Sequence, residues 1–131
     1  MIALDTNVLL RLVVADDPAQ TARAARLLAR ASEGGDPHFV PDIVLCELAW
    51  VLSRSFAFPR AGIAETMAGL VESSELAFRD PAAITAAAAA HALGEGDFAD
   101  HLIAASAAAA GCDSVATFDE ELLKLPGFVA V

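Results

Sequence analysis

The 131-residue sequence is poor in cysteine and in basic side chains, and it contains no long run of large apolar residues. Its two cysteines, Cys46 and Cys112, lie in apolar stretches without a CxxC spacing, so we expect packed thiols rather than a disulfide or a zinc site. The absence of any stretch of about 18 large apolar residues excludes a transmembrane helix. The amino terminus has Asp5 where a signal peptide needs a basic stretch and a longer apolar core, so we expect a cytoplasmic protein without membrane association.

Positive charge is scarce. Eight Lys and Arg residues stand against eighteen Asp and Glu, which gives a formal net charge of −10. An ordinary nucleic-acid-binding protein carries a basic face that neutralises phosphates, so the composition argues against that class. The arginines all lie between Arg11 and Arg79, and after Arg79 the only basic residue is Lys124. Scattered acids would form a solvated surface, whereas acids that converge need a cation.

Short apolar segments alternate with longer segments of helical periodicity along the chain. The length is typical of a single domain, so we expect one domain over residues 1–131. The expected strands are 1–4, 38–41, 75–78, 114–118 and 128–131, and the expected helices are 7–15, 18–32, 43–56, 59–74, 82–93, 97–111 and 120–125. Asp42 is a candidate N-cap, and Asp80 with Pro81 forms a cap and first-turn pair. Strands separated by helices imply crossover connections, so we expect a three-layer α/β/α sandwich with a central, mostly parallel sheet.

Several acids lie where such a fold places functional groups. Asp5 follows the first strand and Asp119 follows the fourth, so both are expected at the carboxyl edge of the sheet. Glu47 lies inside a helix between apolar neighbours, where burying a carboxylate is costly unless something compensates it. Asp97 and Asp100 are three residues apart at a helix start and share one helix face.

Each acid also has a purely structural interpretation. Asp5 could cap the helix that follows it, and Glu47 could extend to solvent from a partly exposed helix. For Asp97 the structural role is favoured, because it is a good N-cap with Asp100 at the capping-box position. Asp119 could be an ordinary turn residue. No single acid decides between these interpretations.

The combination of segments is more specific than any one of them. DTNVLL follows the opening strand, CELAWVL lies in the third helix, and DFADHLIAA and VATFD lie toward the carboxyl end. Together they resemble the PIN-domain nucleases and, within them, the VapC-type toxins of bacterial toxin–antitoxin pairs. The resemblance covers nearly the whole chain. It implies a catalytic and metal-binding acidic cluster at Asp5, Glu47, Asp100 and Asp119.

Other polar residues match the same pattern around these acids. Thr6 and Asn7 follow the first acid and Thr117 precedes the last, where a hydroxyl or amide would hold a ligand carboxylate in orientation. A helix-capping role is about equally expected for Asn7. Asp97 fills a position that many relatives also make acidic. Arg11, near Asp5, is the foremost candidate for substrate binding.

Clustered carboxylates suit Mg²⁺, for which Mn²⁺ substitutes, because hard oxygen ligands select these ions over zinc. The expected reaction is hydrolysis of phosphodiester bonds by a metal-activated water. Similarity to the toxins implies an endoribonuclease that acts on single-stranded or looped RNA, forms a homodimer and is paired with a cognate antitoxin protein.

Two alternatives from other classes remain. A phosphoacceptor signalling domain also gathers acids around Mg²⁺ at strand ends, but it needs a lysine at the end of a late strand, and the only lysine, Lys124, lies past the last acid. A non-catalytic PIN-like module that binds a partner would keep the fold and cut nothing. The presence of all four acids makes this second alternative less favoured.

Overall fold

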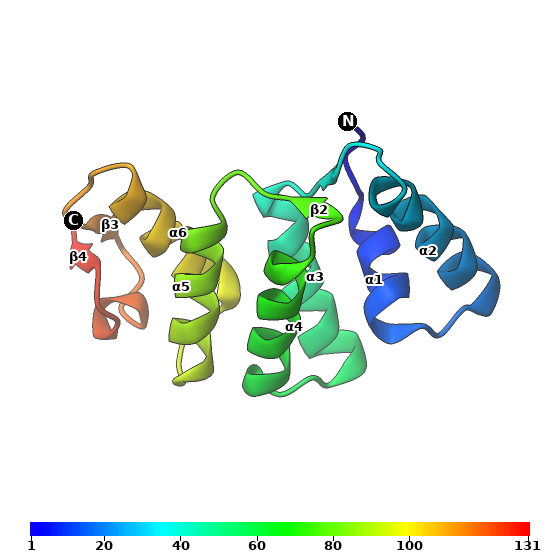
Figure 1. Ribbon diagram of the computed structural model, residues 1–131. Coiled ribbons are helices and arrows are strands. Elements are labelled where there is room, and N and C mark those ends of the chain that lie inside the picture. Colours follow the sequence, from blue (N-terminus) through cyan, green and yellow to red (C-terminus); the bar gives the residue numbers. More distant parts are fainter.

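The computed structural model describes all residues, 1–131, and alternates helices with short strands (Figure 1). The helices are α1 (Thr6–Val14), α2 (Pro18–Ser32), α3 (Asp42–Phe56), α4 (Arg60–Glu72), α5 (Pro81–Ala92) and α6 (Phe98–Ala109), with a 3₁₀ helix, η1 (Leu122–Lys124). The strands are β1 (His38–Phe39), β2 (Leu76–Ala77), β3 (Val115–Thr117) and β4 (Phe128–Ala130).

Aspartate and proline determine where two of the helices begin. Asp17 and Asp80 occupy the N-cap positions of α2 and α5, and the carboxylate of each accepts a hydrogen bond from the backbone N–H three residues later, at 3.1 Å. Pro18 and Pro81 follow in the first helical turn, where a missing N–H costs nothing. The predicted start at Asp80 and Pro81 is confirmed.

The start of α3 differs from the prediction by one residue. Pro41 has extended backbone dihedrals and occupies the N-cap position, so the helical conformation already includes Asp42. The carboxylate of Asp42 makes no capping hydrogen bond and is paired with Arg79 instead. The predicted N-cap role of Asp42 is therefore wrong.

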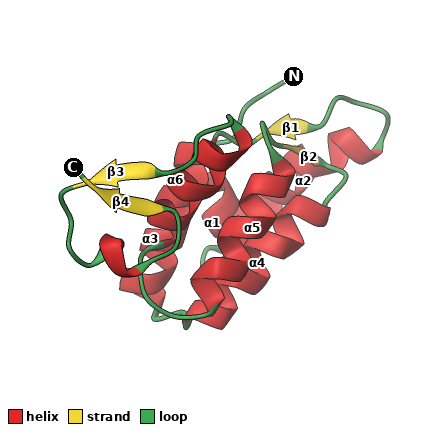
Figure 2. Cartoon of the chain, turned by 90° about the vertical axis from the view of Figure 1, so that its left-hand side faces the viewer, coloured by secondary structure: helices red, strands yellow, loops and turns green.

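All strand pairings are parallel, which confirms the predicted α/β class. β1 pairs with β2, with His38 opposite Leu76, and a single bridge joins Ala3 to Phe39 on the other side of β1. β3 pairs with β4, with Val115 opposite Phe128. The sheet is thus divided into two short pieces rather than one continuous layer, and Figure 2 shows them on different sides of the helices.

The strands are short because capping residues follow them closely. The predicted strand 1–4 is reduced to the bridge at Ala3, since α1 begins at Thr6 with Asp5 as its N-cap. β1 ends before Pro41, which cannot donate a ladder hydrogen bond. The first three strands, β1, β2 and β3, are therefore each followed within a few residues by a helix.

The core is centred on α3. Leu45, Leu48 and Leu52 on this helix are fully buried and belong to one apolar cluster with Met67 of α4 and Phe98 of α6, among others. The helices pack mainly in sequence order, α1 on α2, α3 on α4, α4 on α5 and α5 on α6. In Figure 1 this order places α2 at one end of the molecule and the β3–β4 pair at the other.

α2 is the helix with the weakest apolar anchor. Ala24 is its only buried residue, although Leu27 and Leu28 pack partly buried against the core. Its remaining side chains face solvent or the neighbouring α1.

Both cysteines are free thiols, but only one is packed. Cys46 is half-buried in α3, whereas Cys112 is exposed after the end of α6, so the expectation of a packed thiol is wrong for Cys112. A run of small alanines precedes Cys112, and these side chains do not cover it. None of the helices combines the length and the apolar character that crossing a bilayer requires.

Candidate active site

The first two predicted acids are joined through a threonine. Asp5 caps α1, and its Oδ1 accepts a hydrogen bond of 2.7 Å from the backbone N–H of Thr6. The buried Thr6 hydroxyl donates to Oε2 of Glu47 at 2.7 Å across 41 positions of sequence. The structure therefore brings the DTN segment and the glutamate of α3 together, and Thr6 holds one Glu47 oxygen in a fixed position.

Glu47 lies on the exposed face of α3, as its solvent-reaching interpretation requires. It lines a shallow hollow of about 480 Å³ together with Cys46 and three large apolar side chains, Ile43, Trp50 and Val51. Ile43 and Trp50 are 68% and 58% exposed, so this side of the carboxylate is open to a large ligand.

Asp97 and Asp100 lie at the start of α6. Asp97 is the N-cap residue, and its backbone N–H donates to Oδ2 of Asp100 at 3.0 Å, the capping-box arrangement expected for this pair. Burial raises the pKa of the Cys46 thiol, and the negative charges of Asp42 and Asp100 raise it further. The half-buried Asp100 belongs to α6, which packs against α3, the helix that carries Glu47.

Asp119 occupies a different part of the molecule. It follows β3, which pairs with β4 and packs on α6. β3 forms no pairing with the segment around Ala3, which precedes Asp5. The backbone N–H of Asp119 donates to the Thr117 hydroxyl at 3.0 Å, and its Oδ1 accepts from the N–H of Glu121 at 2.9 Å. In this arrangement Asp119 has the turn-forming role that the sequence also allowed.

The expected convergence of all four carboxylates is thus not reached in this structure, because the sheet is in two pieces. No three His, Cys, Asp or Glu side chains are grouped closely enough to hold a metal ion between them. The donor chemistry of Asp5 and Glu47 nevertheless fits Mg²⁺ or Mn²⁺, since both side chains offer carboxylate oxygens. Mg²⁺ in proteins is commonly bound by one or two carboxylates, with water and substrate phosphate completing the shell, which Asp5 and Glu47 could provide.

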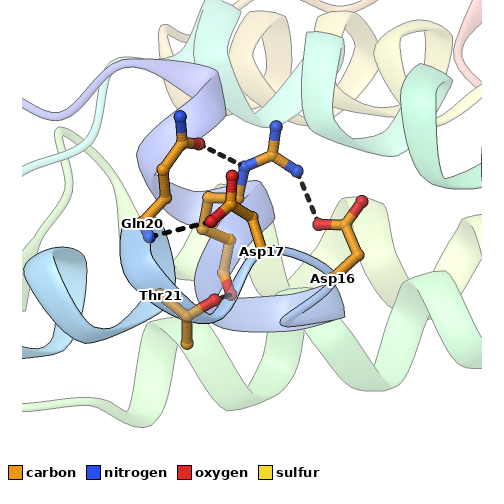
Figure 3. A network of polar contacts seen from close by, with 5 residues as sticks. Asp16, Asp17, Gln20 and Thr21 are labelled. Carbon is orange, nitrogen blue, oxygen red and sulfur yellow. Dashed lines mark hydrogen bonds and ion pairs between the residues drawn. The ribbon is translucent and has the colours of Figure 1, made fainter.

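Asn7 and Arg11 lie away from Glu47, along the side of α1 that faces α2. Arg11 Nε donates to Oε1 of Gln20 at 2.7 Å, and its Nη1 forms an ion pair with Asp16. The hydroxyl of Thr21 donates to the Arg11 carbonyl at 3.1 Å. Figure 3 shows this network, in which residues of α2 and of the preceding loop surround the guanidinium.

Sequence reasoning missed one contact, the pair between Arg79 and Asp42. Arg79 Nε and Nη2 both donate to Oδ2 of Asp42, at 3.1 and 2.7 Å, and this contact raises the pKa of the guanidinium. Oδ1 of Asp42 is buried without a hydrogen-bond partner. The signal was available, because both residues follow the end of a strand, as Asp5 does.

Two buried histidines, His91 and His101, lie in α5 and α6. The Nε2 of His101 lies 2.8 Å from the carbonyl oxygen of Glu95, so its ring is held by contacts within the fold. His91 is buried beside Arg60. Burial is the main cause that lowers its pKa, and the positive charge of Arg60 lowers it further.

A match to a known family model identifies the family of this chain. The chain matches the model of the PIN domain over residues 2–127, which is nearly its whole length. No match was found among curated proteins or among solved structures. Short parallel strands, six helices and this match agree with one another, so the chain belongs to the PIN domain family, whose members are generally nucleases.

Proposed function

We propose that this protein is a Mg²⁺-dependent endoribonuclease and the VapC-type toxin of a toxin–antitoxin pair. The observation that carries the catalytic part is the hydrogen bond from Thr6 to Glu47, which links the acid-bearing start of α1 to an exposed carboxylate of α3. A hydroxyl that fixes one oxygen of a solvent-facing carboxylate is the arrangement that orients a metal ligand. Membership of a nuclease family supports the same conclusion.

The roles of the acids follow from their positions. Asp5 and Glu47 would hold Mg²⁺ or Mn²⁺, and Asp100, on the helix α6 that packs against α3, would orient the attacking water. Asp97 would act through its backbone N–H, which fixes one oxygen of Asp100. The bound ion would lower the pKa of a water and stabilise charge on the leaving oxygen. The role of Asp119, with Thr117, rests on the sequence resemblance.

A homodimer and an antitoxin are the proposed protein partners. Large apolar side chains are exposed on several helices, including Ile43 and Trp50 on α3, Leu93 after α5 and Ile103 on α6. Burying such side chains against a partner removes apolar surface from water, which favours association. Size-exclusion chromatography with light scattering tests the dimer, and a strict monomer at every concentration would contradict it.

Metal binding can be followed with a built-in probe. Trp50 is the only tryptophan and lines the same hollow as Glu47, so paramagnetic Mn²⁺ held there should quench its fluorescence. We expect saturable quenching in the wild type and strongly weakened quenching in Asp5→Asn and Glu47→Gln. Asp80→Asn makes the same chemical change at a helix N-cap outside the site and should titrate like the wild type.

Cleavage is tested with the same variants. We expect Mg²⁺-dependent cleavage of single-stranded RNA by the wild type and by Asp80→Asn, and loss of cleavage in Asp5→Asn and Glu47→Gln without loss of fold. Undiminished cleavage by both site variants would refute the proposal. Absence of cleavage and of Mn²⁺ quenching in the wild type would instead favour the non-catalytic partner-binding module.

A further inference from the structure

The few positive charges of this acidic protein are unevenly distributed in space. Four of its seven arginines line one groove of about 470 Å³ between α1 and α2, the α1–α2 groove. They are Arg11, Arg23, Arg26 and Arg30, and the other lining residues are Asn7, Val8, Gln20, Ala24 and Leu27. No acidic side chain lines this groove, although acids outnumber bases more than twofold in the chain.

Three of these arginines are free. Arg23, Arg26 and Arg30 are exposed on α2, and none of them forms an ion pair or a side-chain hydrogen bond. Their spacing of three and four residues keeps them on one face of the helix, spread over about 10 Å of its axis. The result is a row of unpaired guanidinium groups along one wall of the groove.

The other basic side chains are used within the protein. Three of them are paired with carboxylates, as Arg11–Asp16, Arg79–Asp42 and Lys124–Glu121. The Arg54 guanidinium lies 5.7 Å from the centroid of the Trp50 ring, and Arg60 Nε donates to the carbonyl of His91 at 2.8 Å. Every arginine without an internal partner therefore lies in the α1–α2 groove.

The groove begins near the start of α1, on the side of the helix that faces α2 rather than Glu47. Asn7 lines it and is separated from Asp5 only by Thr6, the residue that binds Glu47. From this end the groove runs along α1 past Arg11, whose guanidinium is already fixed by the contacts in Figure 3. A ligand chain that leaves the carboxylates in this direction passes the three free arginines of α2.

From these observations we infer that the α1–α2 groove binds the phosphate backbone of single-stranded RNA next to the scissile bond. The inference rests on the proposed function and extends it to the path of the substrate. Guanidinium groups bind phosphate oxygens with paired N–H donors, and a row of them follows a backbone whose charges repeat. Val8, Ala24 and Leu27, the apolar residues that line the groove, offer apolar surface to the sugars. The groove thereby supplies the cations that the overall charge of −10 lacks.

Salt dependence of RNA binding tests this inference independently of cleavage. Fluorescein-labelled single-stranded RNA is titrated with the Asp5→Asn variant at several salt concentrations, and anisotropy gives the association constant. Each phosphate contact with a single strand contributes about 0.7 to the slope of log K against log salt concentration. We expect Arg23→Gln, Arg26→Gln and Arg30→Gln each to lower that slope by about 0.7, and the triple variant by about 2. Lys124→Gln removes the same charge from η1, which contacts β4, and Figure 1 shows β4 at the opposite end of the molecule from α2, so this variant should leave the slope unchanged.

The outcomes separate this inference from the proposed function. Unchanged slopes in the arginine variants, with cleavage still dependent on Asp5, would overturn the groove and leave the nuclease intact. Reduced slopes without any Asp5-dependent cleavage would support the groove and reject the nuclease. A polyglutamate peptide that binds more tightly than RNA of equal charge, with the same loss in the variants, would assign the groove to an acidic protein segment and overturn the inference.

Discussion

Replacing Thr6 by valine tests the contact on which the proposed site depends. Valine keeps the volume of threonine but cannot donate the 2.7 Å hydrogen bond to Glu47. A hydrogen bond to a charged acceptor typically contributes about 1.5–3 kcal/mol. Glu47 is exposed, so water replaces the lost donor, and we expect the free energy of unfolding to fall by only about 1 kcal/mol.

The effect on metal binding should be larger than the effect on stability. Groups that orient a metal ligand usually change affinity by about 10–100-fold when removed. This corresponds to about 1.4–2.7 kcal/mol of binding free energy. We therefore expect Thr6→Val to weaken Mn²⁺ binding by this factor, measured by quenching of Trp50 and by calorimetry.

Thr66 provides a matched control for this substitution. Its hydroxyl donates at 2.8 Å to the Gly62 carbonyl within α4, a helix that carries none of the proposed site residues. Thr66→Val removes an equivalent hydroxyl and should bind Mn²⁺ as the wild type does. If Thr6→Val and Thr66→Val have the same affinity for Mn²⁺, the hydroxyl of Thr6 does not orient a metal ligand and the reasoning fails.

Three further predictions concern the stability of the fold. Ala57 is the C-cap of α3 and has a φ of 53°, a left-handed conformation that is unfavourable for residues with a Cβ. Ala57→Gly should therefore raise the free energy of unfolding by about 0.5–1 kcal/mol, measured by denaturant unfolding. A lower free energy of unfolding in this variant would contradict the prediction. Leu48 is fully buried, and Leu48→Ala should cost about 2–5 kcal/mol in the same assay, whereas a cost below 1 kcal/mol would mean that the α3 core is not packed as described. Burial and the Arg60 charge lower the pKa of His91 below its usual 6.5, so the unfolded chain takes up a proton there before the folded chain does. Stability should therefore be complete above about pH 6.5 and fall as the pH drops below it, and thermal melts of His91→Gln should lose part of that dependence.

Local chemistry made much of the fold predictable from sequence. The starts of α5 and α6 follow from Asp80, Pro81 and Asp97, because capping acts within three residues of the helix start. The lengths of the strands and the division of the sheet depend on pairing between distant segments. Local sequence patterns do not predict this pairing. The start of α3 was misplaced by one residue, because Pro41 and not Asp42 occupies the N-cap position.

The candidate site was predictable in part for the same reason. The resemblance named Glu47 as a metal ligand and Thr6 as a residue that orients a ligand carboxylate, but it did not say that the two residues contact each other. Their hydrogen bond is known only from the structure. The pairing of Arg79 with Asp42 joins residues 37 positions apart, and its only signal in the sequence is that each residue follows the end of a strand. The sequence also could not predict that the α2 arginines form no ion pairs, because this depends on which basic side chain each acid contacts in the folded protein.

The weak apolar anchor of α2 has a dynamic consequence. Only Ala24 is buried on this helix, and polar contacts through Gln20 and Thr21 join its first turn to α1. Opening such a segment exposes little apolar surface, so its free energy should lie well below that of global unfolding. Amide hydrogens of α2 should accordingly exchange with deuterium faster than those of α3. A wall that detaches this readily would let the arginine row close around a ligand chain without disturbing the leucine core.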